Sequence, residues 1–273
     1  MPEALEAGPP NVQFGLWPAV AATYASAHGR LPVEAPPCGI TFAATDAELK
    51  PRTLGPEELA RLAADGAGVP PTAGIQLVLD LPGTNGLFAS LGSLESARCF
   101  RALATGRWPE GGALPADLEE LSRSVRTGMD EARMSAALRN RPVLILHGRR
   151  DGLVPVNHSS RAYYGRHVMQ GGSSVHYYEV EHGQHFDAFI PLLPGWSSSF
   201  VPMQPLLVAA MERMHRHLTE GVTLPPSQVV RSFPRRAGES GVEPLWKTNL
   251  GILEDEPGAN EIRLTGKTLQ VPD

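Results

Sequence analysis

A short apolar run at residues 143–146, Val-Leu-Ile-Leu, opens the most regular part of the chain. Such a run is typical of a strand buried on both faces of a parallel sheet. His147 and Gly148 end it. Residues 175–180 then alternate and are rich in β-branched and aromatic side chains, which predicts a second strand. A helix closed by two glycines is expected between the strands, near residues 157–170.

A second helical pattern follows the second strand. Apolar residues recur with helical spacing over residues 203–218, and Gly221 ends the pattern. Strand–helix–strand–helix is the repeat of a parallel sheet, so residues 141–235 are predicted to form the back half of an α/β core. Residues 236–273 are expected to be an irregular tail, in which apolar pairs around a central glycine at residues 262–271 favour a hairpin.

The first 140 residues lack this repeat. They hold at most two short strands, too few to supply the parallel strands that should precede residue 141, so residues 1–140 are predicted to form a mostly helical lid or cap. The expected helices lie within residues 11–27, 56–64, 99–103 and 116–140, the last with a bend at Gly128, and the expected strands at residues 40–44 and 75–81.

Two candidate catalytic residues follow the two strands of the α/β half. Asp151 lies on the loop after the first strand and His185 on the loop after the second. Open α/β sheets place their chemistry at this edge. The order Asp then His matches the last two members of a Ser–Asp–His triad, in which the histidine takes the nucleophile's proton and the carboxylate fixes its tautomer. Either residue alone fits a loop cap or a packed histidine equally well, but the pair favours catalysis.

The other histidines have ordinary explanations or compete for the role of base. His182 is an alternative base on chain position alone. His147 ends a strand and is expected to pack or bond locally, and His158 lies near a helix start. His215 and His217 are expected on a solvated helix face. None has metal-ligand spacing with a second cluster, so no metal and no cofactor are expected.

No nucleophile fits the pattern. A serine hydrolase of this order needs Gly-x-Ser-x-Gly between a strand and a helix, and nothing in the first 150 residues matches it. Ser90 and Cys99 each have a bulky neighbour two positions away, and Ser135 lies in a predicted helix. Residues 195–199, which include Ser197, do not follow a strand. A glycine-rich oxyanion loop is also not found. We therefore expect this chain alone not to turn over esters.

The composition is that of an ordinary globular protein, with 42% hydrophobic and 19% charged residues. A formal net charge of −5 makes no electrostatic case for a nucleic acid or an anionic membrane as partner. No apolar run approaches the ~18 residues that span a bilayer. The first ten residues have neither a basic nor an apolar region, so no secretory signal is expected in this chain.

Cys38 and Cys99 are the only cysteines, too few for a cysteine-based zinc site. They are either two buried thiols or one disulfide, which would need an oxidising compartment.

Several stretches of the chain carry a family resemblance. They are residues 38–46, 68–74, 99–106, 147–161, 184–189 and 224–231. Through them, residues from about 11 to 235 resemble the carboxyl-terminal part of the 3-hydroxybutyrate oligomer hydrolases, also called hydroxybutyrate-dimer hydrolases. The resemblance implies an α/β-hydrolase fold and cleavage of ester bonds in short 3-hydroxybutyrate oligomers, which are breakdown products of polyhydroxybutyrate. It implies Asp151 as triad acid and His185, rather than His182, as triad base.

Members of that family are much longer, carry a serine elbow upstream, and are secreted or periplasmic. The resemblance therefore implies an extracellular or periplasmic protein, a disulfide between Cys38 and Cys99, and a fragment that lacks its amino-terminal half. Another esterase or a peptidase of the same fold is an alternative, as is a non-catalytic partner module that keeps the hydrolase shape. An upstream in-frame Gly-x-Ser-x-Gly would decide for the enzyme.

Overall fold

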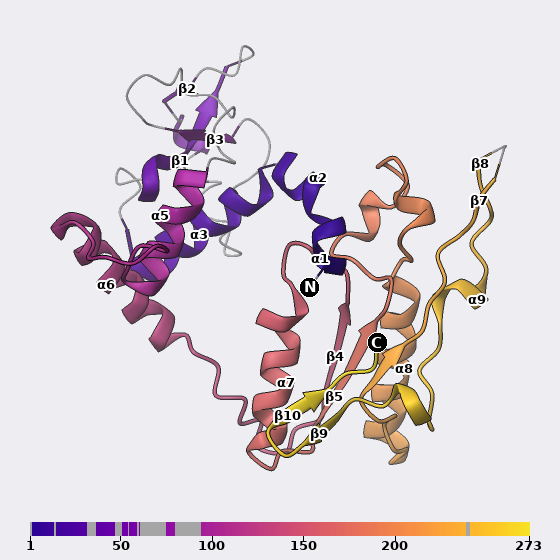
Figure 1. The fold of residues 1–273 in the computed structure, drawn as a ribbon. Coiled ribbons are helices and arrows are strands. Elements are labelled where there is room, and N and C mark those ends of the chain that lie inside the picture. Colours follow the sequence, from indigo (N-terminus) through magenta and orange to yellow (C-terminus); the bar gives the residue numbers. More distant parts are fainter. Residues whose placement is uncertain are drawn as a thin grey trace. The chain divides into compact units, whose positions relative to one another are not determined.

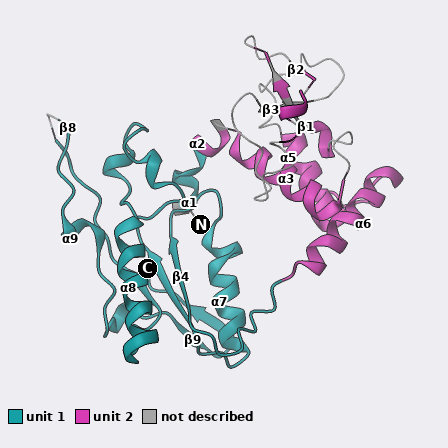
Figure 2. Cartoon of the chain, turned by 180° about the vertical axis from the view of Figure 1, so that it is seen from behind, with its two compact units in different colours: residues 1–9, 134–273 teal, residues 10–133 magenta. Residues whose placement is uncertain are grey.

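The computed structural model describes residues 2–13, 15–31, 37–46, 51–53, 55–58, 60, 75–79, 94–238 and 241–273. The chain divides into two compact units, one made of residues 1–9 and 134–273 and the other of residues 10–133 (Figure 2). The first nine residues thus belong to the same unit as the α/β half. The role of residues 1–140 as a lid stays a prediction.

Three parallel strands form the sheet of the first unit, in the order β4 (Val143–Gly148), β5 (Val175–Val180) and β6 (Gln228–Val230) (Figure 1). Val143 pairs with Val175, and Tyr178 with Gln228. The predicted α/β class with a parallel sheet is confirmed. Strand β6 was not expected, because it is three residues long and follows two prolines.

Helices cover both faces of this sheet. Successive side chains of a strand point to opposite faces. Tyr177 packs with Tyr164 of α7 (Ser160–Met169), and Tyr178 packs with Leu206 of α8 (Gln204–Glu220). Strand β5 is therefore buried on both faces. The apolar run predicted such burial for β4 and not for β5, whose prediction as a strand rested on alternation. Strand β4 is only partly buried up to His147, and among the described residues it pairs with β5 alone.

The expected helix ends and the tail hairpin are confirmed. Gly171 follows α7 and Gly221 follows α8, both with positive φ. The hairpin consists of β9 (Arg263–Thr265) and β10 (Thr268–Gln270).

The other short elements of this unit are α1 (Pro2–Glu6), η3 (Val156–His158), η4 (Asp187–Phe189), η5 (Trp196–Ser198), β7 (Ala237–Gly238), β8 (Gly241–Val242), α9 (Lys247–Leu250) and η6 (Gly258–Asn260).

The second unit contains more strands than expected. An antiparallel sheet has the order β2 (Pro51–Arg52), β1 (Ile40–Thr45) and β3 (Ile75–Leu79). Strand β2 was missed because two residues carry no periodic signal. The expectation of at most two strands was wrong, whereas the predicted strands at residues 40–44 and 75–79 are confirmed. Residues 80–81 lie outside the described residues.

The helices of this unit are α3 (Leu16–Gly29), α5 (Leu94–Thr105) and α6 (Ala116–Glu131); α2 (Gly8–Gln13) crosses the unit boundary. The last predicted helix was too long, since α6 ends at Glu131 and not near residue 140. Gly128 is not a bend but a close approach: a Cβ there would lie 2.0 Å from the carbonyl oxygen of His28. The predicted helix at residues 56–64 lies mostly outside the described residues.

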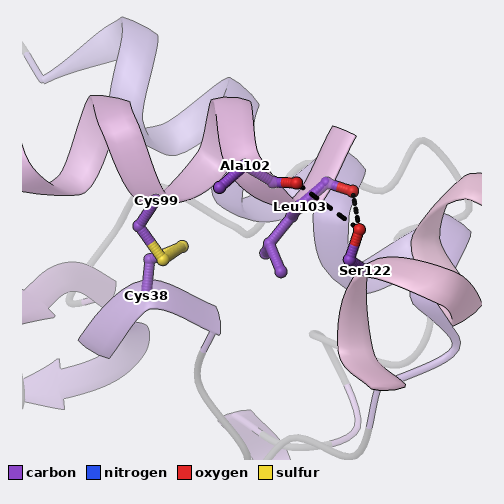
Figure 3. The surroundings of a disulfide bond; sticks show 5 residues. All are labelled: Cys38, Cys99, Ala102, Leu103 and Ser122. Atoms are coloured by element: carbon purple, nitrogen blue, oxygen red, sulfur yellow. Dashed lines mark hydrogen bonds between the residues drawn. A yellow bond between two sulfur atoms is a disulfide. The ribbon is translucent and has the colours of Figure 1, made fainter. Parts of the chain in front are cut away.

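A disulfide joins two elements of the second unit. The sulfurs of Cys38, on η1 (Pro37–Gly39), and Cys99, on α5, are bonded, with a Cα–Cα distance of 5.7 Å (Figure 3). One turn further along α5, Ser122 of α6 donates its hydroxyl to the carbonyl oxygen of Leu103 at 2.8 Å. The disulfide and this bond tie η1, α5 and α6 together around the buried Leu103.

Candidate active site

Two glycines bring the loops after β4 and β5 into contact. A Cβ on Gly148 would lie 2.4 Å from the carbonyl carbon of Gly183, and a Cβ on Gly183 would lie 2.6 Å from the sulfur of Met203. The backbone N–H of Arg150 donates to the carbonyl oxygen of Gly183 at 2.9 Å. The two loops therefore pack backbone against backbone, which a side chain at either glycine would prevent.

This contact brings Asp151 and His185 together. Nδ1 of His185 lies 2.8 Å from Oδ2 of Asp151, within the hydrogen-bond distance expected from the sequence. The Asp151 side chain is 3% exposed. Its other oxygen, Oδ1, accepts the backbone N–H groups of Leu153 at 2.9 Å and Val154 at 2.7 Å. The Asp151 side chain is thus held by its own loop while it faces the histidine.

A second imidazole reaches the same carboxylate oxygen. Nε2 of His147, at the end of β4, lies 3.0 Å from Oδ2 of Asp151. Because an ionised carboxylate only accepts hydrogen bonds, this arrangement assigns a proton to Nδ1 of His185 and another to Nε2 of His147. The local bond expected for His147 is therefore made to the candidate triad acid itself.

The surroundings of Asp151 keep it ionised. Burial by itself would raise the pKa of its carboxyl group, but the hydrogen bonds from His147, His185 and the backbone N–H of Val154 outweigh burial and hold the pKa well below its usual range. A buried acid that stays ionised can fix the tautomer of His185 and stabilise the cation that forms when Nε2 takes up a proton.

The loop of His185 is anchored on both sides. The ring of Phe186 lies edge-on to the imidazole with centroids 4.4 Å apart, and Phe186 in turn lies 4.9 Å from Phe189. Asp187 accepts the backbone N–H groups of Met203 at 2.9 Å and Gln204 at 2.8 Å, at the start of α8. The His185 side chain itself is 34% exposed, and the ring nitrogen that faces Asp151 is Nδ1, not Nε2.

The other histidines singled out by the sequence lie elsewhere. Nδ1 of His182 is 3.3 Å from the hydroxyl of Ser232, and burial lowers the pKa of His182. His158 ends η3, and Nδ1 of His217 bonds the carbonyl oxygen of Val222 at 2.8 Å. The carboxylate of Asp151 is thus bonded to His185 and not to His182.

The serines and cysteine weighed as nucleophiles have other contacts. The Ser197 hydroxyl donates to the carbonyl oxygen of Ile190 at 2.9 Å, Ser135 accepts the N–H of Ala137 at 3.2 Å, and Cys99 is in the disulfide. Ser90 lies outside the described residues. In the part of the chain that the structure describes, no three His, Cys, Asp or Glu side chains gather as a metal site.

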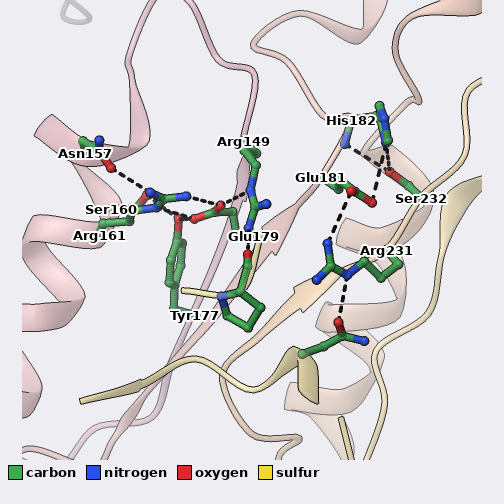
Figure 4. A network of polar contacts seen from close by, with 12 residues as sticks. Arg149, Asn157, Ser160, Arg161, Tyr177, Glu179, Glu181, His182, Arg231 and Ser232 are labelled. Carbon is green, nitrogen blue, oxygen red and sulfur yellow. Dashed lines mark hydrogen bonds and ion pairs between the residues drawn. The ribbon is translucent and has the colours of Figure 1, made fainter. Parts of the chain in front are cut away.

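A buried carboxylate behind the site was not foreseen from the sequence. Glu179 of β5 is fully buried, and its two oxygens accept Arg149 Nε at 2.5 Å, Arg161 Nε at 2.7 Å and the hydroxyl of Tyr177 at 2.7 Å (Figure 4). Burial would raise the pKa of Glu179, but the bond from Arg161 and its other partners hold the pKa below the usual value. Arg149 also donates to the carbonyl oxygen of Pro272, so the cluster ties β4, α7 and the carboxyl-terminal end to β5.

The fold and site together define an α/β protein with a hydrogen-bonded Asp–His pair on the loops that follow adjacent parallel strands. The model of the 3HB-oligomer hydrolase family matches residues 3–273. The chain therefore belongs to this family.

Individual relatives carry the same name as the family. The chain is 36% identical to the D-(-)-3-hydroxybutyrate oligomer hydrolase of Cupriavidus pinatubonensis, over all of this chain and 39% of the relative. It is 38% identical to that of an Azoarcus species and 39% identical to that of Burkholderia cenocepacia, over 90% and 93% of this chain and 36% and 35% of those proteins. The chain thus spans less than two-fifths of the length of these relatives. No solved structure matches it.

Within the described residues, no helix is both long and apolar enough to cross a bilayer.

Proposed function

We propose that this chain is part of a serine ester hydrolase of α/β-hydrolase type that cleaves short oligomers of 3-hydroxybutyrate. The observation that carries the proposal is the 2.8 Å contact between His185 Nδ1 and Asp151 Oδ2 on two adjacent strand-end loops. The names of the relatives support the substrate. Asp151 is then the triad acid and His185 the general base.

In the proposed reaction, Nε2 of His185 takes the proton of a serine hydroxyl as the serine attacks the ester carbonyl. The same nitrogen then returns the proton to the leaving alcohol, and a water molecule repeats the cycle to release the acid. Asp151 stays ionised and stabilises the imidazolium in both halves of the cycle. The serine and the oxyanion donors come from a segment outside these 273 residues.

In this proposal, the further parallel strands of the α/β-hydrolase sheet pair with the free edge of β4. Among the described residues this strand pairs only on its β5 side, and its side chains are half-buried. An unpaired, apolar strand edge invites further pairing. We assign this edge to the amino-terminal part of a longer polypeptide and the protein to an extracellular or periplasmic space. Of the lid predicted at residues 1–140, we assign residues 10–133, the second unit, to that lid. The disulfide supports an oxidising compartment.

A chimera tests the proposal. The part of the Cupriavidus pinatubonensis relative that this chain does not match is joined to residues 1–273, and hydrolysis of the 3-hydroxybutyrate dimer is compared with that of a chromogenic ester and a peptide. We expect the chimera to cleave the dimer and the 273-residue chain alone to cleave none of the three. Preferential cleavage of the peptide would favour a peptidase instead.

Three variants of the chimera identify the residues. Asp151→Ala and His185→Ala should each lower kcat on the order of 10⁴-fold. His182→Ala is the matched control, because His182 lies on the same loop but bonds Ser232, and it should keep activity within about tenfold. A chimera that retains its activity without His185, or turnover by the chain alone, would overturn the proposal.

A further inference from the structure

His147 and His185 share one oxygen of a buried carboxylate. Their nitrogens lie 3.0 and 2.8 Å from Oδ2 of Asp151. The two imidazoles differ in their support: His147 is part of β4 and its side chain is 14% exposed, whereas His185 is on a loop and 34% exposed. The better-buried ring is therefore the one outside the proposed triad.

The carboxylate is fully occupied when both rings donate to it. Each carboxylate oxygen offers two lone pairs. Those of Oδ1 accept the N–H groups of Leu153 and Val154, and those of Oδ2 accept His147 and His185. Rotation of the carboxylate would break bonds at both oxygens. Without His147, one lone pair of Oδ2 would lack a partner in a site that is nearly closed to water.

We propose that His147 is a positioning residue for the Asp151–His185 pair. Its Nε2–H fixes the oxygen that His185 uses and draws part of the carboxylate's negative charge away from His185. Its catalytic meaning rests on the function proposed above, but the hydrogen-bond claim concerns this chain alone.

His147 and His185 share the negative charge of one carboxylate oxygen. Once the donor at position 147 is removed, the whole carboxylate charge faces His185, and an opposite charge at hydrogen-bond distance favours the protonated ring. The neighbouring charged groups are held by other partners: Asp187 by the start of α8, Arg150 by Glu6, and His182 by Ser232. They stay the same in every variant of residue 147 and cancel in that comparison.

Two substitutions separate the donor from the ring. His147→Gln keeps an N–H near the position of Nε2, and His147→Leu removes it. The side-chain nitrogens of His185 are followed by NMR in the 273-residue chain as a function of pH. In the wild type and the glutamine variant, we expect Nδ1 of His185 to carry the proton of the neutral ring. In the leucine variant, the midpoint for His185 should rise by about 0.5–1 pH unit.

Two further variants control for effects on His185 that do not come from the hydrogen bond between His147 and Asp151. His182→Leu removes a histidine from the loop of His185 without touching Asp151, and it should leave the midpoint within about 0.2 unit. His147→Phe keeps the ring volume without a donor and replaces the leucine variant if that variant does not fold. The proposal is wrong if the apolar variants and His147→Gln leave His185 with the same midpoint and tautomer as the wild type.

Turnover gives an independent reading. In the chimera, His147→Leu should lower kcat more than it raises KM and move the acid limb of the pH profile upward, while His147→Gln should restore most of both. The NMR result needs neither serine nor substrate. An inactive chimera with the expected NMR shifts would thus reject the proposed function and leave the role of His147 standing, and an active chimera with an unchanged His185 would do the reverse.

Discussion

Each of the two units of the chain is stabilised internally, and the means differ between them. Residues 10–133 contain both cysteines, and their disulfide ties η1 to α5 beside helices that cross closely at Gly128. The other unit has no cysteine, and its parallel sheet is braced by the buried charge of Glu179. A covalent bond stabilises the unit with short antiparallel strands, and a network of charges stabilises the unit with the candidate site.

This difference follows from what each unit has to hold. The candidate site needs the loops of Asp151 and His185 to stay at hydrogen-bond distance from each other. The Glu179 cluster links the two strands, β4 and β5, that precede these loops. The second unit has to keep η1, α5 and α6 together, and a disulfide does so whatever the charge state of its neighbours. We therefore expect the units to respond to different perturbations: one to reduction, the other to loss of charge.

The largest effect is expected from the disulfide. Replacing both Cys38 and Cys99 with serine should destabilise residues 10–133 by about 4 kcal/mol, because the bond closes a loop with a sequence separation of 61 in the unfolded chain. Hydrogen exchange followed by mass spectrometry separates the two units. Faster exchange in residues 10–133 with unchanged exchange in residues 143–180 is the expected pattern, and equal loss in both would break the comparison.

Glu179→Gln is expected to destabilise the unit with the parallel sheet and to leave residues 10–133 unchanged. The substitution leaves Arg149 and Arg161 without their carboxylate, and breaking a buried ion pair costs about 3 kcal/mol at the lower end of the usual range. The lower end applies because the Arg161 side chain is 24% exposed. Chemical denaturation gives the free energy of unfolding. Glu181→Gln, whose partner Arg231 lies 3.3 Å away near the surface, is the control and should cost less than about 1 kcal/mol.

Gly148→Ala should cost about 2 kcal/mol, because its Cβ would meet the backbone of Gly183 and force the two site loops apart. Gly165→Ala is the matched control in the same unit: a Cβ there meets nothing within 4 Å inside α7, so the change should stabilise by about 0.5–1 kcal/mol. Denaturation midpoints of the two variants measure the difference. Equal midpoints would show that the loops do not depend on their close approach.

The smallest effect concerns acid stability. The folded-state pKa of Asp151 lies below its unfolded value, so its contribution is present above about pH 4 and is lost as the pH falls further. Asp151→Asn should therefore destabilise the protein by about 1–2 kcal/mol at pH 7 and by less near pH 3. Unfolding curves at both pH values provide the test. Asp255→Asn removes an exposed ion pair with Arg213 and should change stability by less than about 0.5 kcal/mol at either pH.

The sequence by itself determined the features that depend on local pattern. The apolar run at residues 143–146, the alternation at residues 175–180 and the glycine stops predicted β4, β5, α7 and α8, because side-chain periodicity and backbone freedom act over a few neighbouring residues. Because parallel strands end at one edge, those elements were enough to place Asp151 and His185 within reach of each other.

Only the tertiary structure decided which distant groups meet. Strand β6 exists because β5 offers it an edge, and its three residues carry no pattern of their own. Glu179 is ionised while buried because Arg149 and Arg161 come from elements 30 and 18 residues away. His147 and Asp151 are only four residues apart, but their bond depends on a turn that is held by the packing of Gly148 against the distant Gly183. Each of these depends on contacts between groups that no repeat in the sequence connects, and the free energy of a buried charge is set by such contacts.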